Sequence, residues 1–219
     1  MVQLDEVRAR VETHYAGLGL PAWPDPHPDA APAREEEYSR LTRPDRYAIV
    51  HARARAWTDA LTHLSGAVAE PLTPAPLDDG VHPHRFDRGV RLSPPRSGTL
   101  PLLLLERDTP LPVLHISVVR PATQLQMLPD CGCDACDRGA DDLLEAIDLA
   151  IGTVVGGPTV VLRGQGWDAH WHPDGGSSHS AVHHLDHRHL MDLCRRLSAG
   201  DTPPLPAGTE AFVGRAWLD

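Results

Sequence analysis

Three cysteines lie close together in the middle of the chain, in the segment Cys131-Gly-Cys133-Asp-Ala-Cys136. Zinc binds thiolates in tetrahedral geometry, and this close spacing allows three of them to converge on one ion. Gly132 would permit the tight backbone turn that such convergence requires. The sequence therefore predicts a zinc site with Cys131, Cys133 and Cys136 as ligands.

Acidic residues surround these cysteines, at Asp130, Asp134 and Asp137. Their carboxylates are expected to raise the pKa values of the thiols and to attract a cation, which favours a metal site over a redox nucleophile. Two alternatives stay open: a redox pair in Cys133-Asp-Ala-Cys136, or thiols that only pack at the entry to a helix. An iron–sulfur cluster would require a further ligand that the sequence does not place.

The fourth zinc ligand is expected to be a histidine, Asp134 or Cys194. Cys194 falls on the apolar stripe of a predicted helix, so burial is the better interpretation of that residue. A metal bound by these ligands would anchor the turn that leads into the next helix and would contribute directly to folding.

A second set of candidate ligands follows Trp167. Asp168, His170 and His172 would share one face of a strand, because side chains alternate along it. The three residues His179, His183 and His187 would share a face if a helix began near Ser180. Two of them with His170 or His172 would form an open zinc site, and Asp168 could act as its base. This alternative is a metal-dependent hydrolase; a solvated face and a flexible loop would explain the same residues.

Composition excludes several classes of protein. The chain has no lysine, which removes Schiff-base enzymes, P-loop nucleotide hydrolases and protein kinases. Its net charge of −10 disfavours binding to nucleic acid or to anionic lipid. It shows no signal peptide and no apolar run long enough to span a membrane. We therefore expect a cytoplasmic protein with reduced cysteines, whose partner is another protein or a small molecule.

The hydrophobic pattern predicts an α+β fold, in which a mostly antiparallel sheet, a meander plus a hairpin, packs with about four helices. Four helices are expected. The first follows Leu4 and the second begins near Thr42. The third runs from about Ala140 to Val155, and the fourth contains Leu190 to Leu197. The expected strands are 86–92, 100–107, 113–120, 123–128, 159–162, 167–172 and 210–217. Residues 70–84 are expected to be a proline-rich connector. A chain of 219 residues fits a single domain, with residues 1–40 as an N-terminal helix and linker and residues 41–219 as the α+β core.

Four sequence features together resemble an uncharacterised family of actinobacterial proteins of about this length. They are Thr42-Arg-Pro-Asp-Arg-Tyr47, the Cys131 to Asp137 cluster, Gly166-Trp167 with His170-Trp171 and Gly175-Gly176, and the terminal Gly214-Arg-Ala-Trp217-Leu218. The resemblance covers most of the chain and implies a single domain. It implies no activity, because the family is defined by sequence alone.

Overall fold

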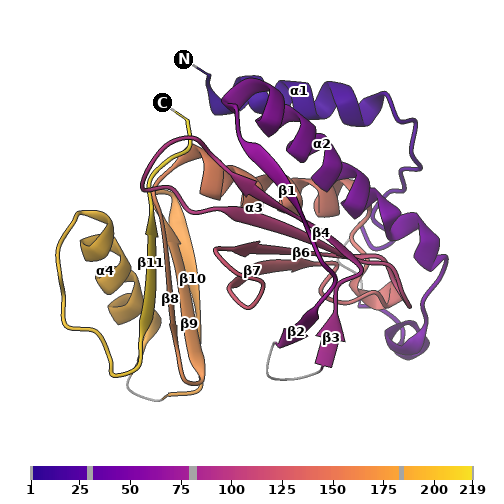
Figure 1. Ribbon diagram of the computed structural model, residues 1–219. Helices are drawn as coiled ribbons and strands as arrows, with labels where there is room; N and C mark the ends of the chain where they lie inside the picture. Colours follow the sequence, from indigo (N-terminus) through magenta and orange to yellow (C-terminus); the bar gives the residue numbers. More distant parts are fainter. Residues whose placement is uncertain (1, 29–31, 79–82, 183–184, 219) are drawn as a thin grey trace.

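Two antiparallel sheets form the framework of the computed structural model, which describes residues 2–28, 32–78, 83–182 and 185–218 (Figure 1). The five-stranded sheet has the order β1-β4-β5-β6-β7 and the four-stranded sheet the order β10-β9-β8-β11. The strands of the first sheet are β1 (Val68–Leu72), β4 (Arg88–Ser93), β5 (Leu102–Arg107), β6 (Val113–Val118) and β7 (Gln124–Leu128). Those of the second are β8 (Thr159–Gly164), β9 (Trp167–His172), β10 (Gly175–Ser180) and β11 (Glu210–Gly214).

Helices cover one face of each sheet (Figure 1). The α-helices are α1 (Leu4–Ala16), α2 (Ile49–Ser65), α3 (Ala140–Gly156) and α4 (His187–Ser198), and the short 3-10 helices are η1 (Glu35–Ser39), η2 (Pro44–Ala48) and η3 (Asp134–Cys136). Helices α2 and α3 pack on the five-stranded sheet, α1 packs on α2, and α4 packs on the four-stranded sheet. A small hairpin, β2 (Pro76–Asp78) and β3 (Pro83–Arg85), completes the described elements.

The first four residues of β5, Leu102 to Leu105, are all leucine and are buried on both faces of the strand. Leu102 and Leu104 belong to the main core beneath the helices. Leu103 and Leu105 face the other way and pack with Leu77 of β2 in a separate small cluster. A strand buried on both sides loses the alternation of polar and apolar residues, which explains the continuous leucine run.

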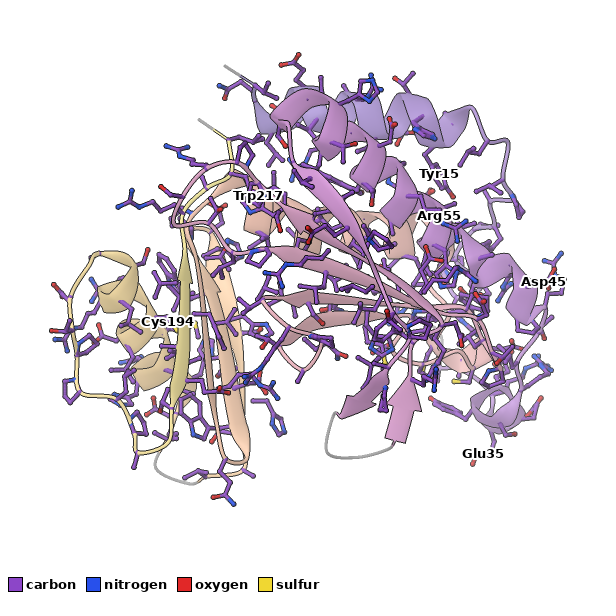
Figure 2. The ribbon with its side chains drawn as sticks, viewed as in Figure 1. Tyr15, Glu35, Asp45, Arg55, Cys194 and Trp217 are labelled. Carbon is purple, nitrogen blue, oxygen red and sulfur yellow. The ribbon has the colours of Figure 1, made fainter. Side chains whose placement is uncertain are left out.

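The two sheets share a hydrophobic core. Val161 of β8 and Trp217 near the C-terminus belong to the same buried cluster as Val7 of α1 and the inner face of α3. Trp217 also donates its backbone N–H to Val155 O at 3.0 Å and its ring N–H to Leu100 O at 3.1 Å. The C-terminal segment, with Trp217 labelled in Figure 2, therefore fastens the second sheet to the end of α3 and to the segment just before β5.

This arrangement confirms the predicted α+β class, with its meander β4–β7 and the hairpin β8–β9. Helix α3 begins at Ala140, as expected from its pattern. Among the described residues, no helix is long and apolar enough to cross a membrane.

The predicted helix start at Thr42 is wrong. Arg43 has a φ of 49°, in the left-handed region, which no α-helix accommodates. Pro44 then begins a 3-10 turn, and α2 itself begins at Ile49. The hydroxyl of Thr42 does not cap a helix, because it donates a hydrogen bond to the distant carboxylate of Asp134.

Two predicted loops contain strands. Within residues 70–84, expected to be a connector, the structure has the end of β1 and the described parts of the β2–β3 hairpin. Pro71 is tolerated because β1 lies at the edge of its sheet, where one row of hydrogen bonds is not required. Strand β10 replaces the flexible loop and the helix expected around Ser180, and helix α4 starts only at His187.

A buried ion pair joins α2 to α3. Asp148 of α3 accepts hydrogen bonds from Arg53 Nε at 2.9 Å and from the Trp57 ring N–H at 2.7 Å. Arg53 is only 5% exposed and Trp57 is fully buried. A guanidinium at this depth requires its carboxylate partner, because an unpaired charge in the core is strongly destabilising.

We predict that Asp148→Ala lowers the free energy of unfolding by about 3 kcal/mol, because it leaves the buried Arg53 without its main partner. Urea denaturation followed by circular dichroism measures the change. Glu145→Ala, at an exposed position of the same helix, is the control and should change stability by no more than about 0.5 kcal/mol. Equal effects of the two substitutions would show that the ion pair does not hold the helices together.

Candidate metal centre

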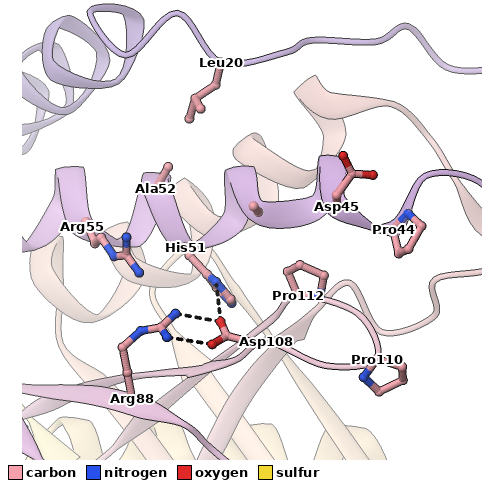
Figure 3. Close-up of a pocket in the computed structure, with 11 residues that line it drawn as sticks. Leu20, Pro44, Asp45, His51, Ala52, Arg55, Arg88, Asp108, Pro110 and Pro112 are labelled. Atoms are coloured by element: carbon pink, nitrogen blue, oxygen red, sulfur yellow. Dashed lines mark hydrogen bonds and ion pairs between the residues drawn. The ribbon is translucent and has the colours of Figure 1, made fainter.

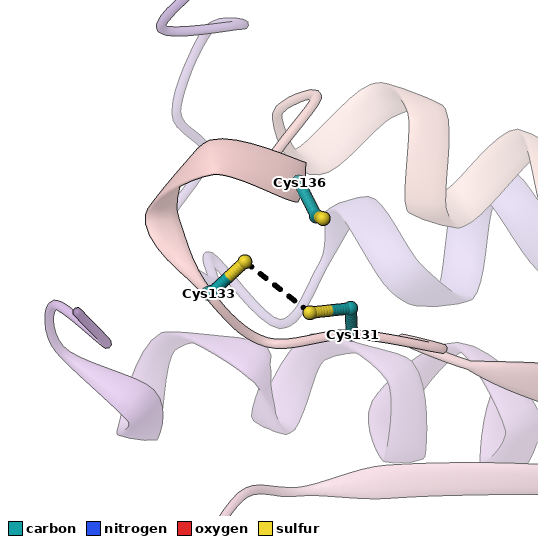
Figure 4. Close-up of side chains that lie close together, drawn as sticks. All are labelled: Cys131, Cys133 and Cys136. Carbon is teal, nitrogen blue, oxygen red and sulfur yellow. Dashed lines mark hydrogen bonds between the residues drawn. The ribbon is translucent and has the colours of Figure 1, made fainter. Parts of the chain in front are cut away.

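The three cysteines of the loop between β7 and α3 converge, as Figure 4 shows. The Sγ atoms of Cys131 and Cys133 are 3.3 Å apart, and all three sulfurs lie within 4.8 Å of one another. All three thiols are free; Cys131 and Cys136 are exposed, and Cys133 is half-buried. Sulfurs around one zinc ion, with bonds of about 2.3 Å, are separated by about 3.8 Å. The group can hold a metal ion with little movement.

Local contacts hold this loop in its turn. The carboxylate of Asp130 accepts the backbone N–H of Cys131 at 2.7 Å, and the N–H of Cys136 donates to Cys133 O at 3.0 Å. At Gly132, a Cβ atom would lie 2.3 Å from Cδ2 of Leu111. Any larger residue there would have to displace the Leu111 side chain, so glycine is favoured by this close approach rather than by a special backbone angle.

Asp134 fastens the loop to a segment far away in the sequence. Its carboxylate accepts hydrogen bonds from Arg40 Nε at 2.5 Å and from the Thr42 backbone N–H and hydroxyl at 2.8 and 2.7 Å. Its own N–H donates to Arg40 O at 2.8 Å. Burial alone would raise the pKa of Asp134, but the hydrogen bonds from Arg40 and Thr42 outweigh it and lower the pKa to about 2.

Asp137 makes a second connection of the same kind. Its carboxylate, 5% exposed, accepts Arg46 Nη2 at 2.5 Å and the ring N–H of Trp23 at 3.0 Å. The Arg46 guanidinium also lies over the Trp23 and Tyr47 rings, at 4.7 and 5.1 Å from their centres. Next to this connection, Gly139 has a φ of 91°, and a Cβ there would press against the backbone of residues 23–25. Residues 23–25 and 40–47 are therefore held against the cysteine loop.

These contacts change the role expected for the aspartates. The carboxylates of Asp134 and Asp137 are neutralised by Arg40 and Arg46 and are directed to those partners. Among the described residues, no histidine, carboxylate or fourth cysteine joins the three sulfurs. Cys194 lies on α4 against the other sheet, fully buried, and burial raises its pKa to about 12. Neither Asp134 nor Cys194 is placed to be the fourth ligand.

The thiols of Cys133 and Cys136 differ in acidity. Burial alone would raise the pKa of Cys133, but hydrogen bonds from the thiols of Cys131 and Cys136 and from the N–H groups of Cys136 and Ala135 outweigh it and lower the pKa. The same thiol contacts, with burial, raise the pKa of Cys136 to about 12. The expectation that the aspartates raise every thiol pKa is therefore wrong for Cys133, which is the first of these two thiols to ionise.

Two cavities adjoin the sulfurs. One, of about 180 Å³, is lined by Cys131 and Cys136 together with Gln126, Arg138 and Asp142. The other, of about 290 Å³, is lined by Cys133 together with Tyr38, Arg40 and Arg107. The cluster is thus reachable from both sides of the loop, which leaves space beside a bound ion for a ligand from outside the chain.

The histidines form no comparable group. His170 and His172 share a face of β9 with Asp168, as predicted, and the strand pairing places His179 opposite Asp168 on that face. His187 is instead held by Ser178, whose hydroxyl lies 3.0 Å from its Nδ1, and His183 lies outside the described residues. Within the described part of the chain, no three of these histidines and acids gather around a common point.

His172 is also in the wrong tautomer for a metal. Its Nδ1 accepts the backbone N–H of Asp174 at 3.2 Å, so the neutral ring carries its proton on Nε2. A metal bound at Nε2 would require a protonated Nδ1, which donates rather than accepts. The geometry of the described residues, which do not include His183, does not support the metal-dependent hydrolase.

A charged cluster that the sequence did not reveal lines a cavity of about 610 Å³ (Figure 3). Arg88 binds both carboxylate oxygens of Asp108 at 2.7 Å and also contacts Glu106, which Arg55 binds as well. His51 donates through Nε2 to Val113 O at 3.0 Å and turns Nδ1 toward Asp108 at 3.7 Å. Because these charges compensate one another, the cluster fits a structural role.

We predict that Asp134→Ala lowers the free energy of unfolding by about 1–3 kcal/mol, since it removes the acceptor of three hydrogen bonds from residues 40–42. Hydrogen exchange at the Thr42 amide should accelerate in the same variant. Asp45→Ala, at an exposed site in the same segment, is the control and should leave both measurements near their original values. If the two variants behave alike, Asp134 does not anchor this segment.

Comparisons with known proteins bear on the family. No curated protein and no solved structure matches the chain. The model of a family of unknown function, DUF6226, matches residues 11–219. That match covers nearly the whole chain and confirms the resemblance to an uncharacterised family inferred from the sequence. The chain belongs to DUF6226, a family of unknown function.

Proposed function

We propose that the protein is a zinc-stabilised binding or interaction module, in which Cys131, Cys133 and Cys136 ligate the ion. One observation carries the proposal: three free thiols lie within 4.8 Å of one another on a loop that Asp134 and Asp137 fasten to Arg40 and Arg46. An ion bound there would cross-link the three cysteines of the loop through its metal–sulfur bonds. Its binding energy would then contribute to the position of α3 and of the N-terminal segment.

Zinc suits these donors better than the other metals that thiolates bind. Thiolate ligands select soft or borderline ions, and hard ions such as magnesium and calcium prefer oxygen. An iron–sulfur cluster ordinarily requires four protein ligands, whereas the described residues supply three. Zinc tolerates three protein ligands when a water or another molecule takes the fourth position.

A partner would bind at the fourth coordination position of the ion, which the three cysteines leave open. The cavities on both sides of the loop give access to the sulfurs, and Gln126, Arg138 and Asp142 supply polar contacts on one side. A donor atom from a small molecule or from another protein could complete the coordination there. The cytoplasm, where thiols stay reduced, is the compartment in which such a site persists. The net charge of −10 makes nucleic acid a poor partner.

Metal analysis of the purified protein tests the site. We expect about one zinc ion per chain, bound also after reduction and reconstitution, because the three thiolates are already close together. Substituting serine for all three cysteines should abolish binding and lower the melting temperature to that of the chelator-treated parent protein. Cys194→Ala, which removes the buried fourth thiol, is the matched control and should keep its zinc.

Two results would contradict the proposal. One is the absence of metal from both the native and the zinc-reconstituted protein. The other is a triple serine variant that binds as much zinc as the parent. Rapid alkylation of Cys133 that zinc does not suppress would favour the redox alternative, since a metal-bound thiolate is protected from alkylation.

We further propose that residues 1–219 fold as one domain, because α1, α3 and the four-stranded sheet contribute to a single buried cluster. Unfolding monitored by far-ultraviolet circular dichroism and by tryptophan fluorescence should then give coincident transitions. Tryptophans are found in α2, in β9 and near the C-terminus, so fluorescence reports on both sheets. Two separated transitions would show that the sheets unfold independently.

A further inference from the structure

A cavity of about 310 Å³ lies between the two sheets; no cysteine lines it, although it shares Gln126 and Ala146 with the cavity beside Cys131 and Cys136. One wall comes from α3 and β7, and the other comes from β9 and β10, which face them in Figure 1. The volume is at the lower end of the range of small-molecule sites, which are typically about 300–1,000 Å³. The residues His170 and His172, singled out by the sequence but without a metal to bind, line this cavity.

The α3 wall is mostly apolar; its Thr153 hydroxyl donates to the backbone O of Leu149, and Gln126 of β7 is its other polar side chain. Ala146, Leu149 and Ala150 share one side of the helix because of their spacing, and Leu125 of β7 continues the same surface. Leu149 is 61% exposed, so its side chain is accessible to a bound molecule. This surface would be stabilised by an apolar group that covers it.

The opposite wall offers hydrogen bonds without charge. The ring of His172 presents Nε2–H as a donor, because its Nδ1 is occupied by the N–H of Asp174. Burial lowers the pKa of His170; Asp168 opposes this effect and Arg163 adds to it, so the ring is neutral at pH 7. Ser177 lies opposite His170 across the β9–β10 pair and adds a hydroxyl.

No aspartate, glutamate or arginine is among the residues that line this cavity, although the chain has a net charge of −10. A charged molecule taken from water into such a site would lose its hydration without gaining an ion pair. An uncharged molecule loses less hydration free energy when it enters the cavity. Its acceptor oxygen can accept the His172 Nε2–H, and its apolar body can cover Leu149 and Ala150.

We propose that this cavity binds a small, uncharged molecule with an aromatic or branched apolar body and a carbonyl-type acceptor oxygen. The apolar body lies on the α3 wall, and the oxygen accepts a hydrogen bond from His172. This site is separate from the cysteine cluster, so the two assignments stand or fall independently.

The test is a titration of the ¹⁵N-labelled full-length chain with indole-3-acetamide, observed by NMR. We expect a dissociation constant of about 1 mM or tighter, from the affinity typical of a ligand of this size. The amide shifts should concentrate on residues 146–153 and on β9 and β10. Indole-3-acetate, which has the same ring but a negative charge, should bind at least about tenfold more weakly.

Two variants locate the site. Ala150→Trp fills the cavity from its partly exposed wall and should abolish binding of the amide. His172→Phe keeps an aromatic ring but removes the hydrogen-bond donor, so it should weaken binding of the amide up to about tenfold. Val68→Trp places the same large ring at an exposed position of β1 and should leave binding unchanged. Unchanged resonances outside the cavity establish that each variant is folded.

Three outcomes would overturn the proposal. The first is that neither probe shifts the resonances of α3 and β9. The second is that the acetate binds as tightly as the amide, or that Ala150→Trp leaves the affinity of the amide unchanged. The third is that the parent chain self-associates in sedimentation experiments and Ala150→Trp abolishes this, which would identify a second copy of the chain as the occupant.

Discussion

The bonds from Arg40 and Arg46 to the two aspartates of the cysteine loop are the interactions on which the rest of the structure depends. Asp134 and Asp137 lie within a few residues of the thiols, yet their carboxylates bind the N-terminal segment. The same contacts fix the entry to α2 from one side and the entry to α3 from the other. Because these two helices cover the five-stranded sheet, the position of the loop determines how the main core is closed. A partly buried carboxylate is well suited to hold the loop in position when an arginine and N–H or O–H groups donate to it. Removing the carboxylate leaves several polar groups without partners.

The parts of the fold that the sequence predicts are those whose pattern is local. The leucine run of β5 and the apolar stripe of α3 each identify one element, and the meander follows from the short turns between strands. The errors arise where a distant residue decides the local structure. Thr42 has the chemistry of a helix cap, but Asp134, 92 positions away, takes its hydroxyl and its N–H. Strand β10 consists of glycine, serine and histidine and has no apolar alternation, so it forms because β9 offers it a complete row of partners.

The candidate site likewise has features that the sequence predicts and features that only the folded chain shows. The three cysteines are close in sequence, and their convergence follows from spacing alone. The partners of the neighbouring aspartates lie 91 to 114 positions away, so only the folded chain shows that these carboxylates belong to arginine, threonine and tryptophan rather than to a metal. For the histidines, the period of a strand correctly places His170 and His172 on one face. The backbone N–H that fixes the tautomer of His172 has no signal in the sequence, and it is this hydrogen bond that separates a metal ligand from a hydrogen-bond donor.

Helix α3 connects the two candidate sites physically. Its first residue, Ala140, donates its N–H to Trp23 O beside the Asp137 contacts, and further along its Ala146 and Ala150 line the cavity between the sheets. If α3 shifts as one unit, a displacement of its first turn also displaces the wall of the cavity relative to His172. Coupling between distant sites requires an element whose position both sites influence, and α3 contributes lining residues to the cavities at both sites. An ion held by the cysteines would restrict the loop that sets the start of α3. A molecule between the sheets would restrict the middle of the same helix. By thermodynamic linkage, if each event favours the same position of α3, each must strengthen the other by the same factor.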